Sequence, residues 1–204
     1  MLLLFAAAVA QAGTISVQTT PGGAQSIPGL VGSTVIDFEG VTAGTYSTLT
    51  LSGVTFTPDG GNLMWVDGSY AGGYNTFGQS LHNNYDPQSF NTLTINFNGT
   101  TNGFGFFWGA SDSQWTLTAY DSSNNVLESF LLPITGPSNA GDFVGIIDPG
   151  IAYATLSWAG SDFIFVDNFE FNGGGAPVPE PGSLVLLGSG ILSAAGIVRR
   201  KLGL

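Results

Sequence analysis

The sequence predicts an all-β fold, an antiparallel β-sandwich or jelly roll followed by one C-terminal transmembrane helix, and three observations predict it. Gly, Thr, Ser, Asn and Phe are abundant, whereas the helix formers Lys, Glu, Arg and Gln are scarce. Several segments alternate apolar and polar residues with period two, and clusters of turn-forming residues separate them. The chain ends in an uncharged apolar stretch and a basic cluster.

Strands are expected where apolar residues recur at every second position. The clearest cases are residues 92–97, where Leu, Ile and Phe alternate with Thr and Asn, and residues 115–119. Strands this short, with turns between them and no helical periods, predict antiparallel sheets. The longest stretch without a predicted strand is 67–90. The expected strands are 34–39, 46–57, 62–66, 91–97, 103–108, 114–120, 126–132, 142–147, 151–158 and 163–171.

The N-terminus has the pattern of a cleavable secretion signal. Residues 1–12 form an apolar segment that ends in Ala10-Gln11-Ala12, the small-x-small pattern that signal peptidase accepts, so the mature protein is expected to begin at Gly13. A Lys or Arg should stand near the start of such a signal, and its absence indicates that the natural start lies upstream. The alternative interpretation is a buried first strand.

Composition divides the chain after the signal. Residues 13–33 are an N-terminal lead-in, and residues 34–172 are the β-sandwich domain. The chain has no cysteine, so the stability of the domain must come from its core rather than from disulfides. Residues 173–177 are a Gly-rich linker that cannot pack.

The C-terminus combines three features within residues 178–201. Residues 183–198 are uncharged and close to the lower limit of about 17 residues for a spanning helix. The basic residues that follow would stop the helix on the cytoplasmic side and leave the domain outside. The motif before the helix is Val178, Pro179, Glu180 and Pro181, and the membrane stop is Arg199, Arg200 and Lys201.

This arrangement resembles the PEP-CTERM sorting signal of Gram-negative bacteria. The resemblance implies recognition by exosortase, a membrane cysteine transpeptidase-like enzyme that removes the helix near Pro179-Glu180-Pro181. It implies exosortase and, transiently, the inner membrane as partners, in addition to the signal peptidase expected from residues 10–12, and a final location at the cell surface or in an extracellular, exopolysaccharide-associated layer. Neither a GPI signal nor a sortase signal fits the residues. A permanent single-span anchor stays open as an alternative and leaves the topology unchanged.

The central domain carries a second, weaker resemblance. The segment 105–112, Gly-Phe-Phe-Trp-Gly-Ala-Ser-Asp, is similar to the WGS-x-D segment of a group of exosortase-dependent surface proteins. Residues 119–121 and the closing segment 163–171 fit the same group. Ala110 stands where that group would have Ser. The group has no firmly known biochemical activity, so the resemblance implies no reaction.

The charges exclude some partners and favour others. The net charge is −11, and no Lys or Arg precedes Arg199. Such a surface repels nucleic acid and anionic lipid headgroups, and it attracts divalent cations. Calcium, which takes six to eight oxygen ligands, is the expected ion, with Asp37, Glu39 and Asp167 as its ligands because jelly rolls often join their first and last strands. Solvent-facing carboxylates are the alternative.

No catalytic residue is predicted, so the protein is not expected to be an enzyme. The sequence has no Gly-x-Ser-x-Gly elbow, and its single histidine, His82, stands in a loop-like context that predicts a solvated or hydrogen-bonded side chain. The alternative is a secreted polysaccharide-active hydrolase, whose two carboxylates would come from Glu39, Glu128 and Glu170.

Aromatic residues suggest carbohydrate binding, with exopolysaccharide as the partner. Trp108, Trp115 and Trp158 lie within strand patterns and are expected in the core. Four others lie in or beside the stretch 67–90, where exposed rings would stack on sugar rings. The predicted ligand residues are Trp65, Tyr70, Tyr74 and Tyr85.

Overall fold

The computed structural model describes residues 14–18, 27, 29–30, 33–83, 90–136 and 142–173. The elements in this part of the chain are strands and one short 3-10 turn, which confirms the predicted all-β class. In chain order they are β1 (Thr14–Gln18), β2 (Thr34–Ile36), β3 (Gly44–Tyr46), β4 (Leu49–Leu51), β5 (Val54–Pro58), η1 (Asp59–Gly61), β6 (Met64–Asp67), β7 (Ser80–His82), β8 (Thr92–Gly109), β9 (Thr116–Tyr120), β10 (Val126–Leu131), β11 (Phe143–Ser157) and β12 (Phe165–Gly173).

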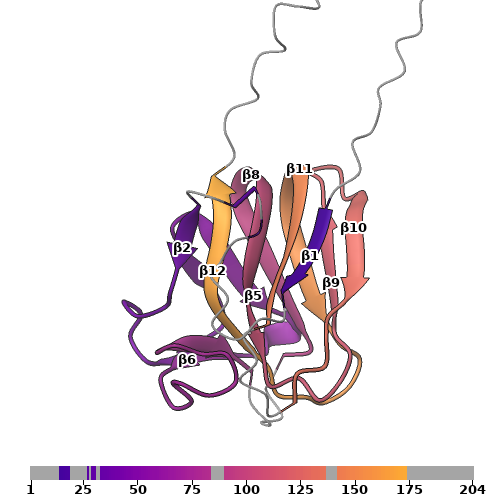
Figure 1. Ribbon diagram of the computed structural model, residues 1–204. Helices are drawn as coiled ribbons and strands as arrows, with labels where there is room; N and C mark the ends of the chain where they lie inside the picture. Colours follow the sequence, from indigo (N-terminus) through magenta and orange to yellow (C-terminus); the bar gives the residue numbers. More distant parts are fainter. Residues whose placement is uncertain are drawn as a thin grey trace, which may run out of the picture. The chain divides into compact units, whose positions relative to one another are not determined.

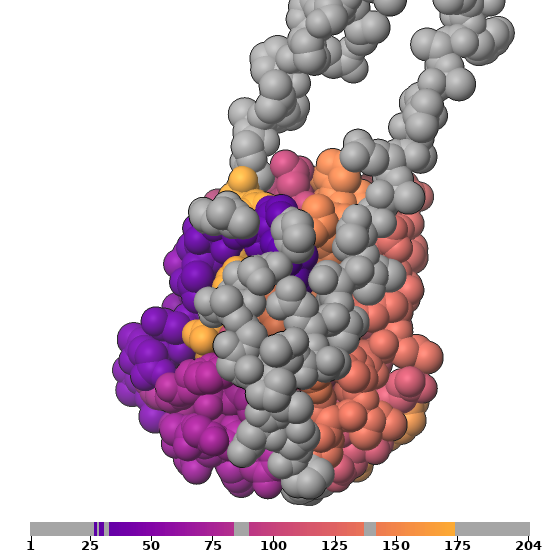
Figure 2. Space-filling view, in the orientation of Figure 1, coloured from indigo at the N-terminus to yellow at the C-terminus, as the bar shows by residue number. Residues whose placement is uncertain are grey.

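The strands form two antiparallel layers joined by the two longest strands (Figure 1). The first sheet has the order β10-β9-β11-β8-β5-β4 and uses the C-terminal half of β11 and the N-terminal half of β8. The second sheet has the order β1-β11-β8-β12-β7-β6-β3 and uses their other halves, while β2 also pairs with β12. Figure 2 places β2 and β6 on the left of the domain and β9 and β10 on the right.

Strands β8 and β11 are continuous where the sequence predicts two strands each. Asn98-Gly99 lies inside β8, and the strand bends there rather than reversing because its partner β11 stays paired on both sides of the bend. Gly99 has a φ of 99° and Gly150 of β11 has a φ of 86°, values that favour glycine. The register shifts between Ile147 and Tyr153 mark the same bend.

The predicted strand 46–57 is also wrong, because this range holds two strands joined by a hairpin turn instead of one. Leu51 pairs with Val54, so Ser52 and Gly53 form a two-residue loop between β4 and β5. Both have positive φ, 49° and 87°, as a type I′ turn requires. Three further strands were not predicted: β1, in the lead-in 13–33, β3, which overlaps the predicted strand 46–57 only at Tyr46, and β7, in the stretch 67–90.

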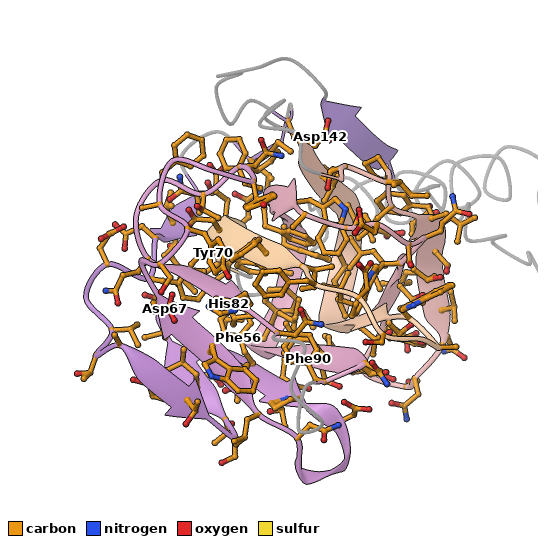
Figure 3. All side chains as sticks on the ribbon, turned by 90° about the horizontal axis from the view of Figure 1, so that it is seen from below. Phe56, Asp67, Tyr70, His82, Phe90 and Asp142 are labelled. Carbon is orange, nitrogen blue, oxygen red and sulfur yellow. The ribbon has the colours of Figure 1, made fainter. Side chains whose placement is uncertain are left out.

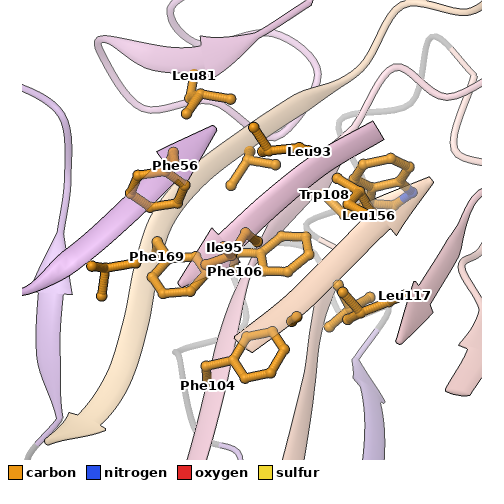
Figure 4. Close-up of a cluster of buried hydrophobic side chains, with 14 of the residues drawn as sticks. Phe56, Leu81, Leu93, Ile95, Phe104, Phe106, Trp108, Leu117, Leu156 and Phe169 are labelled. Atoms are coloured by element: carbon orange, nitrogen blue, oxygen red, sulfur yellow. The ribbon is translucent and has the colours of Figure 1, made fainter. Parts of the chain in front are cut away.

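The core lies between the two layers and is rich in phenylalanine (Figure 4). Trp108 and Trp115 are fully buried, as predicted, and Trp158 packs against the core while remaining partly exposed. Phe104 and Phe106 stack on Phe169 at ring-centroid distances of 5.8 and 5.9 Å. Burying a phenylalanine side chain stabilises a fold by roughly 1.5–3 kcal/mol, so these rings hold the layers together without disulfides.

The ends of the chain lie largely outside the described residues. Several predicted segments fall there: the signal 1–12, the linker 173–177 except Gly173, the sorting motif, the helix 183–198 and the basic stop. In the described ranges, no helix has the length and apolar character to cross a membrane.

Candidate functional site

Aromatic side chains from three segments gather at the β6–β7 end of the domain. Three of the four predicted ligand residues, Trp65, Tyr70 and Tyr74, belong to this group, which we call the aromatic cluster, and Tyr85 lies outside the described residues. Tyr70 is central, since its ring lies 5.9 Å from that of Tyr74 and 5.0 Å from that of Phe165. The aromatic cluster consists of Trp65, Tyr70, Tyr74, His82, Phe163 and Phe165.

Exposure within the aromatic cluster is uneven. Tyr70 is 40% exposed, while Trp65 and Tyr74 are half-buried. The Tyr74 ring stacks on Phe165 at 5.6 Å, and the Trp65 ring stacks on His82 at 6.5 Å. Neighbouring rings therefore hold each other in place, and Tyr70 is the member that presents most surface to a ligand.

His82 occupies the base of the aromatic cluster, and its predicted loop position is wrong. It lies on β7 and is 3% exposed, because β7 is paired with β6 on one side and β12 on the other. Nδ1 is 2.7 Å from the carbonyl oxygen of Asn83, and Nε2 is 3.4 Å from Oδ2 of Asp67 (Figure 3). The Nδ1 contact and the surrounding rings hold the imidazole in a packed position, which fits a structural residue better than a catalytic base.

The contact with His82 contributes to the pKa of Asp67. Burial alone would raise the pKa of Asp67, but hydrogen bonds from Ser69 and the adjacent His82 ring outweigh it and lower the pKa below its usual value. The carboxylate therefore stays ionised beside the imidazole. This interaction ties the start of the β6–β7 loop to β7.

The predicted calcium ligands come together near the same end of β12, beside the β6–β7 loop. Asp37 and Glu39 follow β2, which pairs with β12 so that Phe169 lies opposite Ile36. Asp167 is 1% exposed, and its carboxylate accepts the backbone N–H of Phe77 at 2.8 Å and of Asn168 at 2.7 Å. Burial, with the negative charges of Glu39 and Asp37, raises the pKa of Asp167 to about 7 despite these hydrogen bonds.

The neighbouring carboxylates are held by backbone donors as well. Glu39 Oε1 accepts the N–H of Gln79 at 2.8 Å, and Asp37 Oδ1 accepts the N–H of Glu39 at 3.2 Å. Within the part of the chain that the structure describes, no group of three or more His, Cys, Asp or Glu side chains is arranged to hold a metal ion. Calcium binding at these three residues stays a prediction.

The carboxylates considered for hydrolysis come from three separate elements. Glu170 on β12 is buried and accepts a hydrogen bond from Ser33 Oγ at 3.0 Å, and burial raises its pKa. Glu128 lies on β10, at the opposite end of the strand order, and Glu39 lies in the exposed turn after β2. None of the three lines the cleft described below.

The segment similar to WGS-x-D has a structural explanation. Gly109 lies under the β6–β7 loop, where a Cβ would come within 1.7 Å of the Tyr74 carbonyl oxygen, and Asn75 Nδ2 donates to the Trp108 carbonyl at 2.8 Å. Ala110 adopts a positive φ of 65°. The buried Asp162 accepts backbone N–H groups that include that of Asp112, at 3.1 Å, so the segment organises two loops.

A second surface was missed by sequence reasoning. A cleft of about 570 Å³ opens on the outer face of the first sheet, within the range of about 300–1,000 Å³ typical of small-molecule sites. The sequence signal that could have revealed this surface is the set of polar residues that alternate with apolar ones in the strands, since these Thr and Ser residues face outward here. Its lining includes Thr92, Gln114, Thr116, Leu131, Ser157 and Trp158.

Comparison with known proteins identifies the tail. Residues 177–201 match the family model of the PEP-CTERM protein-sorting motif. The chain therefore carries a signal for export and cell-surface sorting, as the sequence predicted. No curated protein matches the chain.

Several solved structures are distantly similar to it. A family 6 carbohydrate-binding module is 16% identical with a TM-score of 0.32, and the match covers 69% of this chain and 93% of that one. A family 29 carbohydrate-binding module is 14% identical with a TM-score of 0.30, covering 82% and 99%. The catalytic domain of a GH87 α-1,3-glucanase is 15% identical with a TM-score of 0.35, covering 73% and 29%. TM-scores this low assign no function.

Proposed function

We propose that this exported surface protein is processed by signal peptidase and exosortase, and that its β-sandwich binds polysaccharide of the surface layer without cleaving it. The sorting motif at residues 177–201 supports the first part. Its apolar stretch would hold the chain in the inner membrane, with the basic stop inside, until the cut near Pro179-Glu180-Pro181.

One observation carries the binding part: Tyr70 is exposed on top of a packed base of other aromatic rings. An exposed ring that its neighbours hold in one orientation stacks on the apolar face of a sugar without losing much conformational freedom on binding. Trp65 and Tyr74, which are partly exposed, add ring surface within the same cluster. The aromatic cluster is therefore a platform for at least one sugar ring.

Binding is tested with the full chain, purified in a polyoxyethylene detergent that carries no sugar headgroup. Migration through gels that contain hydroxyethylcellulose, dextran or laminarin measures retention, and an assay for newly released reducing ends measures cleavage. Retention without release is expected. Release of chain ends would support the hydrolase alternative instead.

The aromatic cluster is tested by Tyr70→Ala. The variant should lose most retention, because stacking of one sugar ring is removed. Thermal melting checks that the variant stays folded, since the Tyr70 ring also packs against its neighbours in the aromatic cluster. Ile134→Ala is the matched control, because Ile134 is 59% exposed and lies outside the aromatic cluster. Equal retention of both variants would contradict the assignment of the platform.

Processing is tested by the intact mass of protein released from a host that contains exosortase. We expect a first residue of Gly13 and loss of everything beyond the Pro179-Glu180-Pro181 region. A mass that still includes Arg199, Arg200 and Lys201 would favour the permanent anchor.

A further inference from the structure

The outer face of the first sheet is covered with hydroxyl groups in register. Along each strand alternate residues point away from the core, and antiparallel pairing aligns them into rows across the sheet. In the row nearest the cleft, Ser157 of β11 lies between Thr92 of β8 and Thr116 of β9, and Thr116 lies opposite Leu131 of β10.

The next row crosses five strands. Thr155 of β11 lies between Thr94 and Thr118, and the row continues to Ser129 of β10 on one side and Thr57 of β5 on the other. At a strand spacing of about 4.8 Å this row extends for about 19 Å, which accommodates several sugar rings.

A third row adds aromatic rings. Tyr153 of β11 stacks on Tyr120 of β9 at a ring-centroid distance of 4.6 Å and an interplanar angle of 8°. Asn96 of β8 and Thr55 of β5 continue this row. We call the three rows together the hydroxyl face.

Many of these polar groups make no hydrogen bond to the residues that the structure describes. Thr118 and Ser129 bond each other at 2.9 Å, as do Thr55 and Thr50. The hydroxyls nearer the middle and the cleft make no hydrogen bond to any residue in the described ranges, so they are available to a ligand. They belong to Thr92, Thr94, Thr116, Thr155 and Ser157.

The hydroxyl face is uncharged in a chain whose net charge is −11. The rest of the domain repels polyanions, and this face offers no cation to bind them. Its groups are hydroxyls and an amide that both donate and accept, with rings of Tyr153, Tyr120 and Trp158 near its two ends. This chemistry complements an uncharged polymer of hydroxyl-bearing rings.

We propose that the hydroxyl face binds an uncharged polysaccharide chain, which lies across the strands with one sugar ring in the cleft against Trp158. The inference rests on the proposed function, that the domain binds polysaccharide, and it names the ligand class and a surface separate from the aromatic cluster. Trp158 packs one side against the core and leaves another side toward the cleft, as a fixed stacking surface requires.

The test removes hydroxyls without changing shape. Thr94→Val with Thr155→Val keeps β-branched side chains at strand positions, so the fold is expected to be preserved. Retention in gels that contain hydroxyethylcellulose, dextran or laminarin should weaken about tenfold for the polymer that binds, the loss expected for two net hydrogen bonds. Thr34→Val is the matched control, because Thr34 is an exposed strand residue of β2, outside the hydroxyl face. Tyr153→Ala, checked by thermal melting, is a second variant expected to weaken retention.

The outcomes separate the two proposals. If the wild type is retained and the paired Val variant is equally retained while Tyr70→Ala is not, this inference is overturned and the proposed function stands. If the wild type is retained neither by these polymers nor by anionic alginate, both fail. Retention by anionic alginate alone would overturn the uncharged ligand class. Sedimentation that shows self-association abolished by the paired Val variant would put a second copy on the face and overturn the inference.

Discussion

Replacing Asp167 by Asn should remove a large pH dependence of stability. The Asp167 carboxyl is buried between β12 and the Phe77 backbone, near two other carboxylates, and its pKa in the folded protein is about 7. In the unfolded chain the pKa is expected to be near 3.8. The folded state therefore binds a proton between these pH values that the unfolded state does not bind.

The sign follows from this difference. A carboxyl group whose pKa is raised on folding favours the folded state when it is protonated, so its contribution is lost as pH rises from about 4 through about 7. At 1.36 kcal/mol per pKa unit, the difference between 3.8 and about 7 corresponds to about 4 kcal/mol, which we take as an upper limit. Asp142, Asp148 and Glu170 have pKa values raised mainly by burial and add smaller effects of the same sign.

Urea unfolding at pH 5, 6, 7 and 8 measures the effect. Asn cannot ionise. Its NH2 group takes the place of one of the two oxygens that accept the Phe77 and Asn168 N–H groups, so the variant should be less stable than the wild type at pH 5. Between pH 5 and pH 8 the deficit should shrink or reverse by up to about 2.7 kcal/mol, because only about two pKa units separate pH 5 from the folded-state pKa of about 7. Asp112→Asn, at an exposed position, is the control. Parallel stability curves for the wild type and Asp167→Asn would refute the argument.

Three further predictions concern the same domain. If Asp37, Glu39 and Asp167 bind calcium, adding calcium at pH 8 raises the melting temperature and Asp167→Asn removes that rise, since an ion at 100 times its Kd stabilises by about 2.7 kcal/mol; equal rises in both proteins would exclude this site. Gly109→Ala should destabilise by about 1–3 kcal/mol, because a Cβ there meets the Tyr74 carbonyl, whereas Gly40→Ala, with open space around it, should change the free energy of unfolding by less than about 0.5 kcal/mol. Asp162→Ala should cost at least about 3 kcal/mol, because the Trp115 indole N–H, 2.8 Å away, and several backbone N–H groups lose their acceptor; a cost below about 1 kcal/mol by urea unfolding would show that water replaces it.

Much of the fold was predictable because its signals are local. Period-two patterns identified β8, β9 and β11, and the apolar members of those patterns are core residues such as Leu93, Ile95 and Leu117. The sorting tag was equally readable, since a short motif, an apolar stretch and a basic stop follow one another in the chain. Each of these inferences needed only neighbouring residues.

The turn chemistry was predictable only in part. Ser52-Gly53 reverses the chain and Asn98-Gly99 merely bends it, although the second dipeptide is the stronger hairpin signal. The difference arises because β11 pairs with β8 on both sides of Asn98. A chain reversal there would cost more free energy than a bend, because it would break this pairing. A dipeptide cannot report what lies beside it in the sheet.

By itself the sequence determined the all-β class, the residues that face the core and the sorting of the chain, because each depends on alternation or order along the backbone. Only the tertiary structure decided that His82 is buried, that Tyr70 stands on a base of rings, and that Thr94, Thr155 and Thr118 share one row. Alternation tells which face of a strand a side chain occupies. Which strands become neighbours depends on pairings between residues far apart in the chain, and those pairings assemble both candidate binding surfaces.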